Sequence, residues 1–223
     1  MTPERFQRIS AVLNKRQPDL TVITDDVHKG QNLSAIVRTC DAVGIPEIHA
    51  VYSKGEYRPH TGTAMGSQKW VQANIWPSVA EPIEALKSKG FQIVAAHFSE
   101  KAVDFRQVDY CQPTALLLGA EREGVSDGAL AAVDQEITVP MLGMVESFNV
   151  SVACAIILSE AQRQRQAAGF YDQRRLPDQQ YHKTLFEWCH PVIADYCKAK
   201  GLEYPGLNEQ GDVANPDSLK RGD

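Results

Sequence analysis

Apolar segments of strand type alternate with segments of helical periodicity through most of this chain. Strands are expected at residues 20–23, 48–52, 70–75, 91–97, 114–118 and 136–141. Helices are expected at residues 3–16, 32–44, 83–89, 126–133 and 149–166, with Asn32, Ser126 and Asn149 as N-terminal caps. This alternation is typical of an α/β fold with a mainly parallel sheet. The sequence therefore predicts an α/β domain.

We expect this α/β core to span residues 20–166. A basic helix precedes it at residues 1–19, and a helical extension follows at residues 167–223. Beyond Leu202 the composition turns to Gly, Pro, Asn and Asp, which predicts a loose tail. The chain has 223 residues, 43% of them hydrophobic, which suits one substantial domain with terminal extensions and excludes a wholly disordered chain.

Several sequence features indicate a cytoplasmic protein without a membrane span. No apolar run approaches the ~18 residues that cross a bilayer, and residues 1–6 lack the apolar core of a signal peptide. The five cysteines are an odd number without a CxxC pair, so we expect reduced, mostly buried thiols. The histidines at 28, 49, 97 and 190 show no metal-ligand spacing, so no metal site is expected.

Charge is distributed unevenly around a formal net value of −5. Basic residues concentrate in residues 1–20 and 155–200, whereas residues 40–154 are acidic. A local basic face can bind phosphate even on an acidic protein, so nucleic acid remains a candidate partner. Ordinary solvated helices carry similar charges, so the pattern alone does not decide between the two.

Three segments could carry chemistry, and the first two are a helix start and a glycine-bounded turn. In Asn32–Thr39, Arg38 lies off the apolar stripe and could hold a phosphate or carboxylate, or be a plain surface arginine. In Leu116–Gly124, an apolar strand enters a turn suited to a ligand, although an ordinary βα turn fits equally well. Neither a P-loop nor a dinucleotide-binding fingerprint occurs.

The third segment, Val139–Ala153, is a loop that leads into a helix start rich in Ser and Asn. Exposed amides and capping oxygens at such a start bind polar ligand groups. Ordinary capping explains Asn149 but not the whole loop. The arginines in Gln162–Gln166 and at 174–175 could bind RNA, or could simply complement a helix dipole.

Together these three segments resemble the three motifs of the SPOUT superfamily of RNA methyltransferases. Further stretches are similar to its TrmH branch, the tRNA (guanosine-2′-O)-methyltransferases: RQPDLTV at 16–22, WVQ at 70–72, AVDFR at 102–106 and SEAQRQRQ at 159–166. The resemblance covers roughly residues 3–205. It implies a SPOUT-type parallel sheet with a deep C-terminal trefoil knot, and a homodimer whose partner subunit completes each active site.

The resemblance also implies the reaction and its residues. S-adenosylmethionine would bind in the knot near Ala96, Leu117, Gly119, Gly124, Val139, Met141 and Phe148. Arg38 would hold an RNA phosphate and stabilise the developing alkoxide, since its pKa is too high for a general base. Asn32 and Glu121 would orient Arg38, while Asn149 and Ser151 would position the ribose.

The resemblance implies that the substrate is the D-loop guanosine at position 18 of tRNA. The tRNA would be bound by Arg5, Arg8, Arg16, Arg163, Arg165, Arg174 and Arg175. Two rivals remain: a related 2′-O-methyltransferase of ribosomal RNA or another tRNA position, and a non-catalytic RNA-binding protein. Two residues depart from the branch pattern. Phe148 replaces a usual Leu, and Gly30 replaces a usual Pro.

Overall fold

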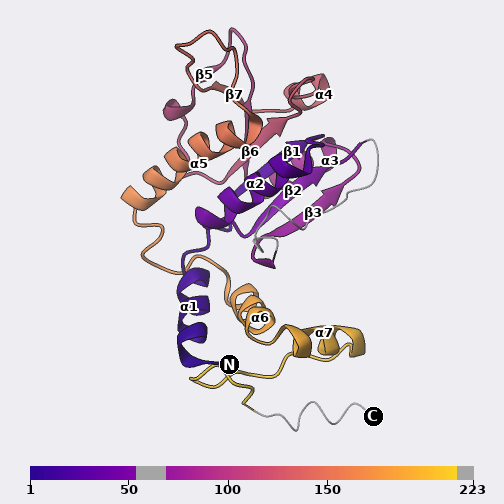
Figure 1. Cartoon of the computed structure of the whole chain (residues 1–223), viewed down its shortest axis with the longest axis vertical. Helices are drawn as coiled ribbons and strands as arrows, with labels where there is room; N and C mark the ends of the chain where they lie inside the picture. Colours follow the sequence, from indigo (N-terminus) through magenta and orange to yellow (C-terminus); the bar gives the residue numbers. More distant parts are fainter. Residues whose placement is uncertain (54–68, 215–223) are drawn as a thin grey trace. The chain divides into compact units, whose positions relative to one another are not determined.

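The computed structural model describes residues 1–53 and 69–214 (Figure 1). Its contacts divide the chain into two compact units. One unit is formed by Gln17–Phe170, which we call the sheet unit. The other is formed by Met1–Arg16 together with the chain from Tyr171 onward, which we call the terminal unit.

The described part of the sheet unit contains seven strands in one sheet, and every pairing between neighbours is parallel. The strands are β1 (Leu20–Asp25), β2 (Glu47–Val51), β3 (Gln72–Trp76), β4 (Gln92–Ala96), β5 (Val103–Asp104), β6 (Thr114–Gly119) and β7 (Gln135–Thr138). Their order is β3-β2-β1-β6-β4-β7-β5. The predicted α/β class is confirmed. The two-residue strand β5 was not expected, because it is too short to show a hydrophobic pattern.

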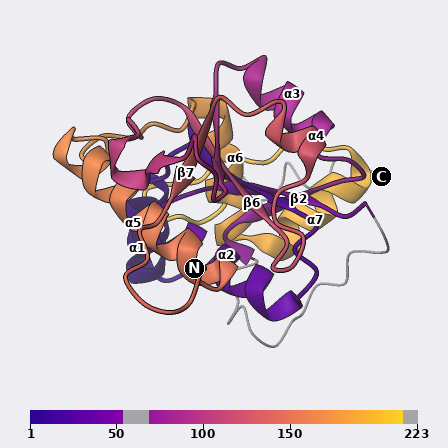
Figure 2. The ribbon, with the colours of Figure 1, turned by 90° about the horizontal axis from the view of Figure 1, so that it is seen from above.

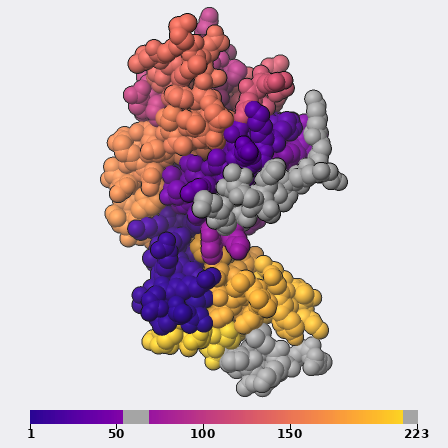
Figure 3. Space-filling model, viewed as in Figure 1, coloured from indigo at the N-terminus to yellow at the C-terminus, as the bar shows by residue number. Residues whose placement is uncertain are grey.

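Helices cover both faces of this sheet. Figure 2 shows α2 (Gly30–Ala42) and α5 (Val150–Ala167) on one side, with α3 (Ala80–Lys87) and α4 (Asp127–Leu130) on the other. The helices α2 and α5 pack directly against each other, and they lie side by side on the surface in Figure 3.

The alternation of side chains along β6 explains how one strand serves both faces. Leu116 and Leu118 pack with the α2 and α5 core, whereas Leu117 packs with Ile83 of α3. Because both faces are covered, the central strands β1 and β6 are buried along nearly their whole length, as expected for a parallel sheet.

The helix starts differ from the predicted caps in an informative way. The Asn149 side chain accepts a hydrogen bond from the Ser151 amide, so it caps α5 as predicted. Ser126 occupies the N-cap position of α4 without a side-chain capping bond. The prediction that Asn32 caps α2 is wrong, because this helix already begins at Gly30 and the Asn32 side chain is engaged elsewhere.

The terminal unit is built from α1 (Pro3–Leu13), α6 (Asp178–Cys189) and α7 (Pro191–Lys200). The apolar stripe of α1, including Ile9 and Leu13, packs with residues of α6 such as Leu185. Residues 202–214 do not form the loose tail that was expected. There the His190 ring nitrogen contacts the Gly211 carbonyl at 2.7 Å, and Leu207 pairs with Val213.

All five cysteines lie in the described residues without a disulfide bond, and four of them are buried, in agreement with the prediction of mostly buried thiols. Among the described residues, no helix is long and apolar enough to cross a membrane.

Candidate functional site

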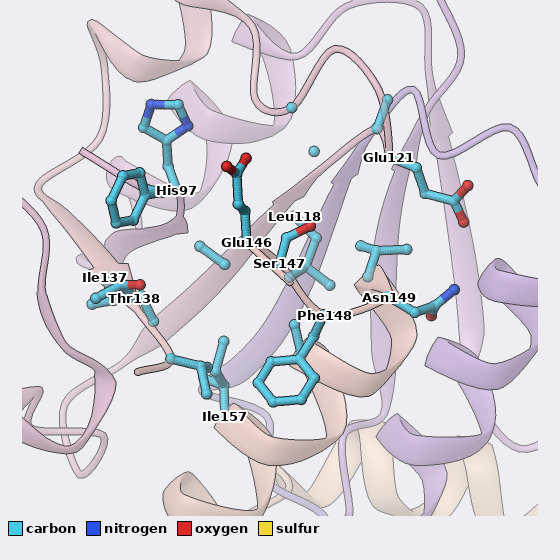
Figure 4. A pocket seen from close by; sticks show the side chains of 18 of the residues that line it. His97, Leu118, Glu121, Ile137, Thr138, Glu146, Ser147, Phe148, Asn149 and Ile157 are labelled. Atoms are coloured by element: carbon cyan, nitrogen blue, oxygen red, sulfur yellow. The ribbon is translucent and has the colours of Figure 1, made fainter. Parts of the chain in front are cut away.

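A cavity of about 480 Å³ opens where β4, β6 and β7 end. Most of its lining comes from three segments at the ends of these strands: residues 96–98, 118–124 and 137–150. Lys29, Ala153 and Ile157 complete the lining. Figure 4 shows Glu121 and Asn149 on one side and His97 on the other, with Glu146 projecting between them. Because parallel strands bring their carboxyl ends to one edge, the three segments meet in a single pocket.

The turn after β6 is held in one tight conformation. A Cβ atom on Gly119 would lie 2.1 Å from the Gly124 carbonyl carbon, so only glycine permits this approach. Ala120 and Gly124 exchange two backbone hydrogen bonds of 3.0 and 2.9 Å, and Gly124 has a positive φ of 70°. The loop between them therefore presents Glu121 in a fixed position.

The buried carboxylate of Asp25, at the end of β1, supports the same turn from the other side. Its Oδ2 atom accepts a hydrogen bond of 3.0 Å from the Ser126 amide. Asp25 is only 5% exposed and pairs with Gly119 across the β1–β6 ladder. It was not singled out from the sequence, because nothing in a short Asp-Asp run indicates which carboxylate is buried.

Four of the five predicted catalytic residues form one chain of hydrogen bonds. The Asn32 amide donates to Glu121, and Asn149 donates to Asn32 Oδ1 at 3.2 Å. Ser151 Oγ then donates to Asn149 Oδ1 at 2.6 Å. The chain joins the segments that follow β1, β6 and β7, so it fixes their mutual geometry at the pocket.

The fifth predicted residue, Arg38, lies on α2. It is exposed there and is not among the residues that line the pocket.

Six of the seven predicted cofactor residues line the pocket: Ala96, Gly119, Gly124, Val139, Met141 and Phe148. Leu117 does not, because its side chain faces the opposite core, and Leu118 lines the pocket in its place. Phe148 is 40% exposed, so the larger residue at this position is accommodated without being enclosed.

Five polar residues that line the pocket were not among the predicted site residues: Lys29, His97, Thr138, Glu146 and Ser147. Lys29 forms an ion pair with Glu121, and its own side chain is 72% exposed. Its position three residues before Asn32 was the available signal, but a lysine at a helix start is too common to be selected on spacing alone.

Two predicted RNA contacts are corrected by their burial. The Arg165 side chain is fully buried and donates to Asp19 Oδ1 at 2.6 Å, and to the carbonyls of Tyr110 and Gln112 at 2.8 and 3.1 Å. Arg16 is 1% exposed and stacks over the Trp188 ring at 5.2 Å. A guanidinium group without access to solvent cannot contact a phosphate, so both arginines are structural.

The other predicted RNA contacts remain available to different degrees. Arg5, Arg8 and Arg174 are exposed in the terminal unit, and Arg175 there is half-buried. Arg163 is exposed in the sheet unit, where a two-point ion pair with Glu160 lowers the pKa of that carboxyl group. Contact of these arginines with RNA stays a prediction.

The pocket has the size and chemistry of a site for a nucleoside-type cofactor. Its volume lies in the range of small-molecule sites, and apolar walls alternate with a few polar groups. Gly119, Ala120 and Gly124 of the tight turn line it directly, so this wall carries little side-chain bulk. The described residues contain no group of three or more His, Cys, Asp or Glu that could hold a metal ion.

Comparison with known proteins agrees with this geometry. Residues 19–159 match the model of the SpoU rRNA Methylase family, and residues 163–216 match that of the SpoU rRNA methylase C-terminal region. A tRNA (guanosine(18)-2′-O)-methyltransferase of Escherichia coli is 49% identical over 215 residues, covering 96% of this chain and 94% of that protein.

Solved structures give the same result. The TrmH/SpoU tRNA modifying enzyme of A. aeolicus has a TM-score of 0.80 and 42% identity, covering 85% of this chain and 97% of the other. The SpoU methyltransferase AviRb of Streptomyces viridochromogenes, in complex with AdoMet, has a TM-score of 0.62 and 25% identity, covering 69% and 62%. Since the family model spans most of the chain and the resemblance of the three motifs is confirmed, this chain belongs to the SpoU rRNA methylase family.

Proposed function

We propose that this chain transfers a methyl group from S-adenosylmethionine to the ribose 2′-hydroxyl of guanosine 18 in tRNA. The observation that carries this proposal is the near-complete match to a relative named for that reaction, 49% identical over 96% of this chain. The cofactor follows from the methyltransferase family and from a structural neighbour solved with AdoMet. When bound, it supplies an electrophilic methyl group for direct transfer to oxygen.

The chain's own residues have to bind and orient the ribose and stabilise the charge that develops on its oxygen. We assign the ribose to Asn149 and Ser151, which lie at the start of α5 beside the pocket. Glu121 and Asn32 hold Asn149 in place through the hydrogen-bond chain. Preorganised donors of this kind lower the barrier because they need no rearrangement during reaction.

Arg38 is assigned to the RNA phosphate and to the developing alkoxide, and its position supports a homodimer. It is exposed on α2 and is not among the residues that line the pocket of its own chain. A second copy that presents its α2 to the pocket would supply the missing cation. We therefore propose a site completed by the partner subunit, in a cytoplasmic dimer whose α5 threads a trefoil knot.

A mixed-dimer experiment tests the shared site. Dimers that combine an Arg38→Ala chain with an Asn149→Ala chain should regain up to one intact site, while each single variant is inactive. Complete absence of activity in the mixed dimer would place Arg38 and Asn149 in the same chain's site and contradict the arrangement.

A methylation map of total tRNA after incubation with protein and S-adenosylmethionine tests the reaction itself. A single new 2′-O-methyl mark at guanosine 18 is the expected result. A mark at another position or on ribosomal RNA would indicate the alternative specificity, that of a related 2′-O-methyltransferase with a different target. Cofactor binding without any mark would instead indicate a non-catalytic RNA-binding protein.

A further inference from the structure

The ion pair between Lys29 and Glu121 introduces a cation that the proposed reaction does not yet use. Glu121 engages two partners, because Oε1 accepts from Asn32 and Oε2 accepts from Lys29. The Lys29 side chain is 72% exposed, compared with 23% for Glu121. The lysine thus lies on the solvent side of the pair, at the mouth of the pocket.

The charges that line this pocket make the position of Lys29 important. Apart from Lys29, the ionised side chains among the described lining residues are the carboxylates of Glu121 and Glu146. An RNA ribose can reach the pocket only if its flanking phosphates approach these carboxylates, which repel them. Lys29 offsets the charge of one of them, Glu121, through a direct ion pair.

The chemistry of a lysine ammonium permits a second contact. It carries three donor hydrogens, and Glu121 is the one acceptor recorded for them in the described structure. No side chain caps the α2 N-terminus beside Lys29, and no acidic residue lies in its first turn. The helix dipole therefore adds to the positive potential there.

We propose that Lys29 is a substrate-contacting residue that binds an RNA backbone phosphate next to the methylated ribose while it remains paired with Glu121. This inference rests on the proposed tRNA methylation and adds one specific contact to it. Lys29 helps to bind the RNA and to set its register on the protein, because phosphate contacts position a nucleic acid without reading its sequence. The competing anionic ligand for Lys29 is the carboxylate group of S-adenosylmethionine.

The experiment measures tRNA affinity against salt concentration for Lys29→Met, Lys29→Arg and a matched control, Lys87→Met. Lys87 is a suitable control because it also pairs with a carboxylate, Asp134 at 2.8 Å, but lies on α3 and does not line the pocket. Cofactor affinity is measured separately by calorimetry, and initial rates give kcat and KM for tRNA.

The expected result for Lys29→Met is a tRNA KM raised about tenfold, and a slope of log K against log salt that is about one unit shallower. Cofactor affinity should stay within about twofold. Lys29→Arg should keep most of the slope, since it preserves the charge. Lys87→Met should match the wild type in all three measurements.

Two outcomes overturn the proposal. An unchanged salt slope with weakened cofactor binding would assign Lys29 to the cofactor carboxylate. An unchanged slope with a reduced kcat would leave it only a role in positioning Glu121. Failure of the proposed function is separately visible: the wild type would then place no mark on guanosine 18, whatever the salt slope of the variant.

Discussion

The two edges of the parallel sheet treat charge in opposite ways. At the amino edge, where β1 and β6 begin, the Arg165 guanidinium is fully buried and its donors are matched by Asp19 and by backbone carbonyls. At the carboxyl edge, Glu121 and Lys29 stay partly exposed around a cavity. Closed polar networks rigidify a fold, whereas open ones leave groups free to meet a ligand. The amino edge therefore contributes to stability, and the carboxyl edge offers charged groups to a ligand.

Removing the buried arginine should give the largest effect. Arg165→Ala leaves the Asp19 carboxylate, the Gln17 side-chain carbonyl and three backbone carbonyls without this donor, which should lower the free energy of unfolding by about 3–5 kcal/mol. Urea unfolding measures this. Arg163→Ala is the control on the same helix, and loss of its exposed, solvent-screened pair with Glu160 should change stability much less. Equal losses would contradict the contrast between the edges.

A methyl group on Gly119 should disturb the carboxyl edge next most strongly. The new Cβ would meet the Gly124 backbone at about 2 Å, and backbone cannot move aside as a side chain can. We expect a loss of about 3 kcal/mol in stability and at least a tenfold loss in cofactor affinity. Gly128→Ala, which meets no atom within 4 Å, is the control. Unchanged cofactor binding in Gly119→Ala would separate this turn from the site.

Asp25→Ala should have a smaller effect, because it removes one charged hydrogen bond to Ser126. Its loss should cost about 2 kcal/mol and raise the cofactor KM. Asp25→Asn keeps an acceptor oxygen and should restore most of the affinity. If Asn and Ala behave alike, the contact with Ser126 does not position the turn.

The smallest effect concerns His49, which is buried on β2. It is 4% exposed and accepts from Trp76 at 3.1 Å, and burial lowers its pKa below 6.5. The unfolded chain therefore binds this proton more readily, so stability holds above pH 6.5 and decreases as the pH falls toward the lowered pKa. His49→Gln should flatten the dependence of unfolding free energy on pH between 5 and 7; an unchanged slope would assign it to other groups.

Much of the fold could be predicted from hydrophobic spacing, because most strands and helices are long enough to show a period. The sequence could not separate Arg163 from Arg165. They are two residues apart on α5 and so point to different sides, but which side is buried depends on Asp19 and Tyr110, which lie far away in the chain. Leu117 and Leu118 present the same problem on β6.

The site could be predicted in part through its motifs. Asn32, Glu121 and Asn149 were placed in one site, and the structure joins them by hydrogen bonds. Lys29 and Asp25 were missed because their roles depend on partners that the linear sequence does not indicate. The wrong cap at Asn32 has the same origin: a long-range partner, Glu121, takes the amide side chain.

The side-chain amide of Gln17 donates to the Phe170 carbonyl at 3.2 Å, so the chain enters and leaves the sheet unit at one spot. The terminal unit is thus encoded in two distant stretches of the gene but joined through a single place in space. Recombination that exchanged only one stretch would separate core residues that pack together, such as Ile9 and Leu185. Swapping both stretches together would keep this shared core intact, so an exchange has to treat them as one module.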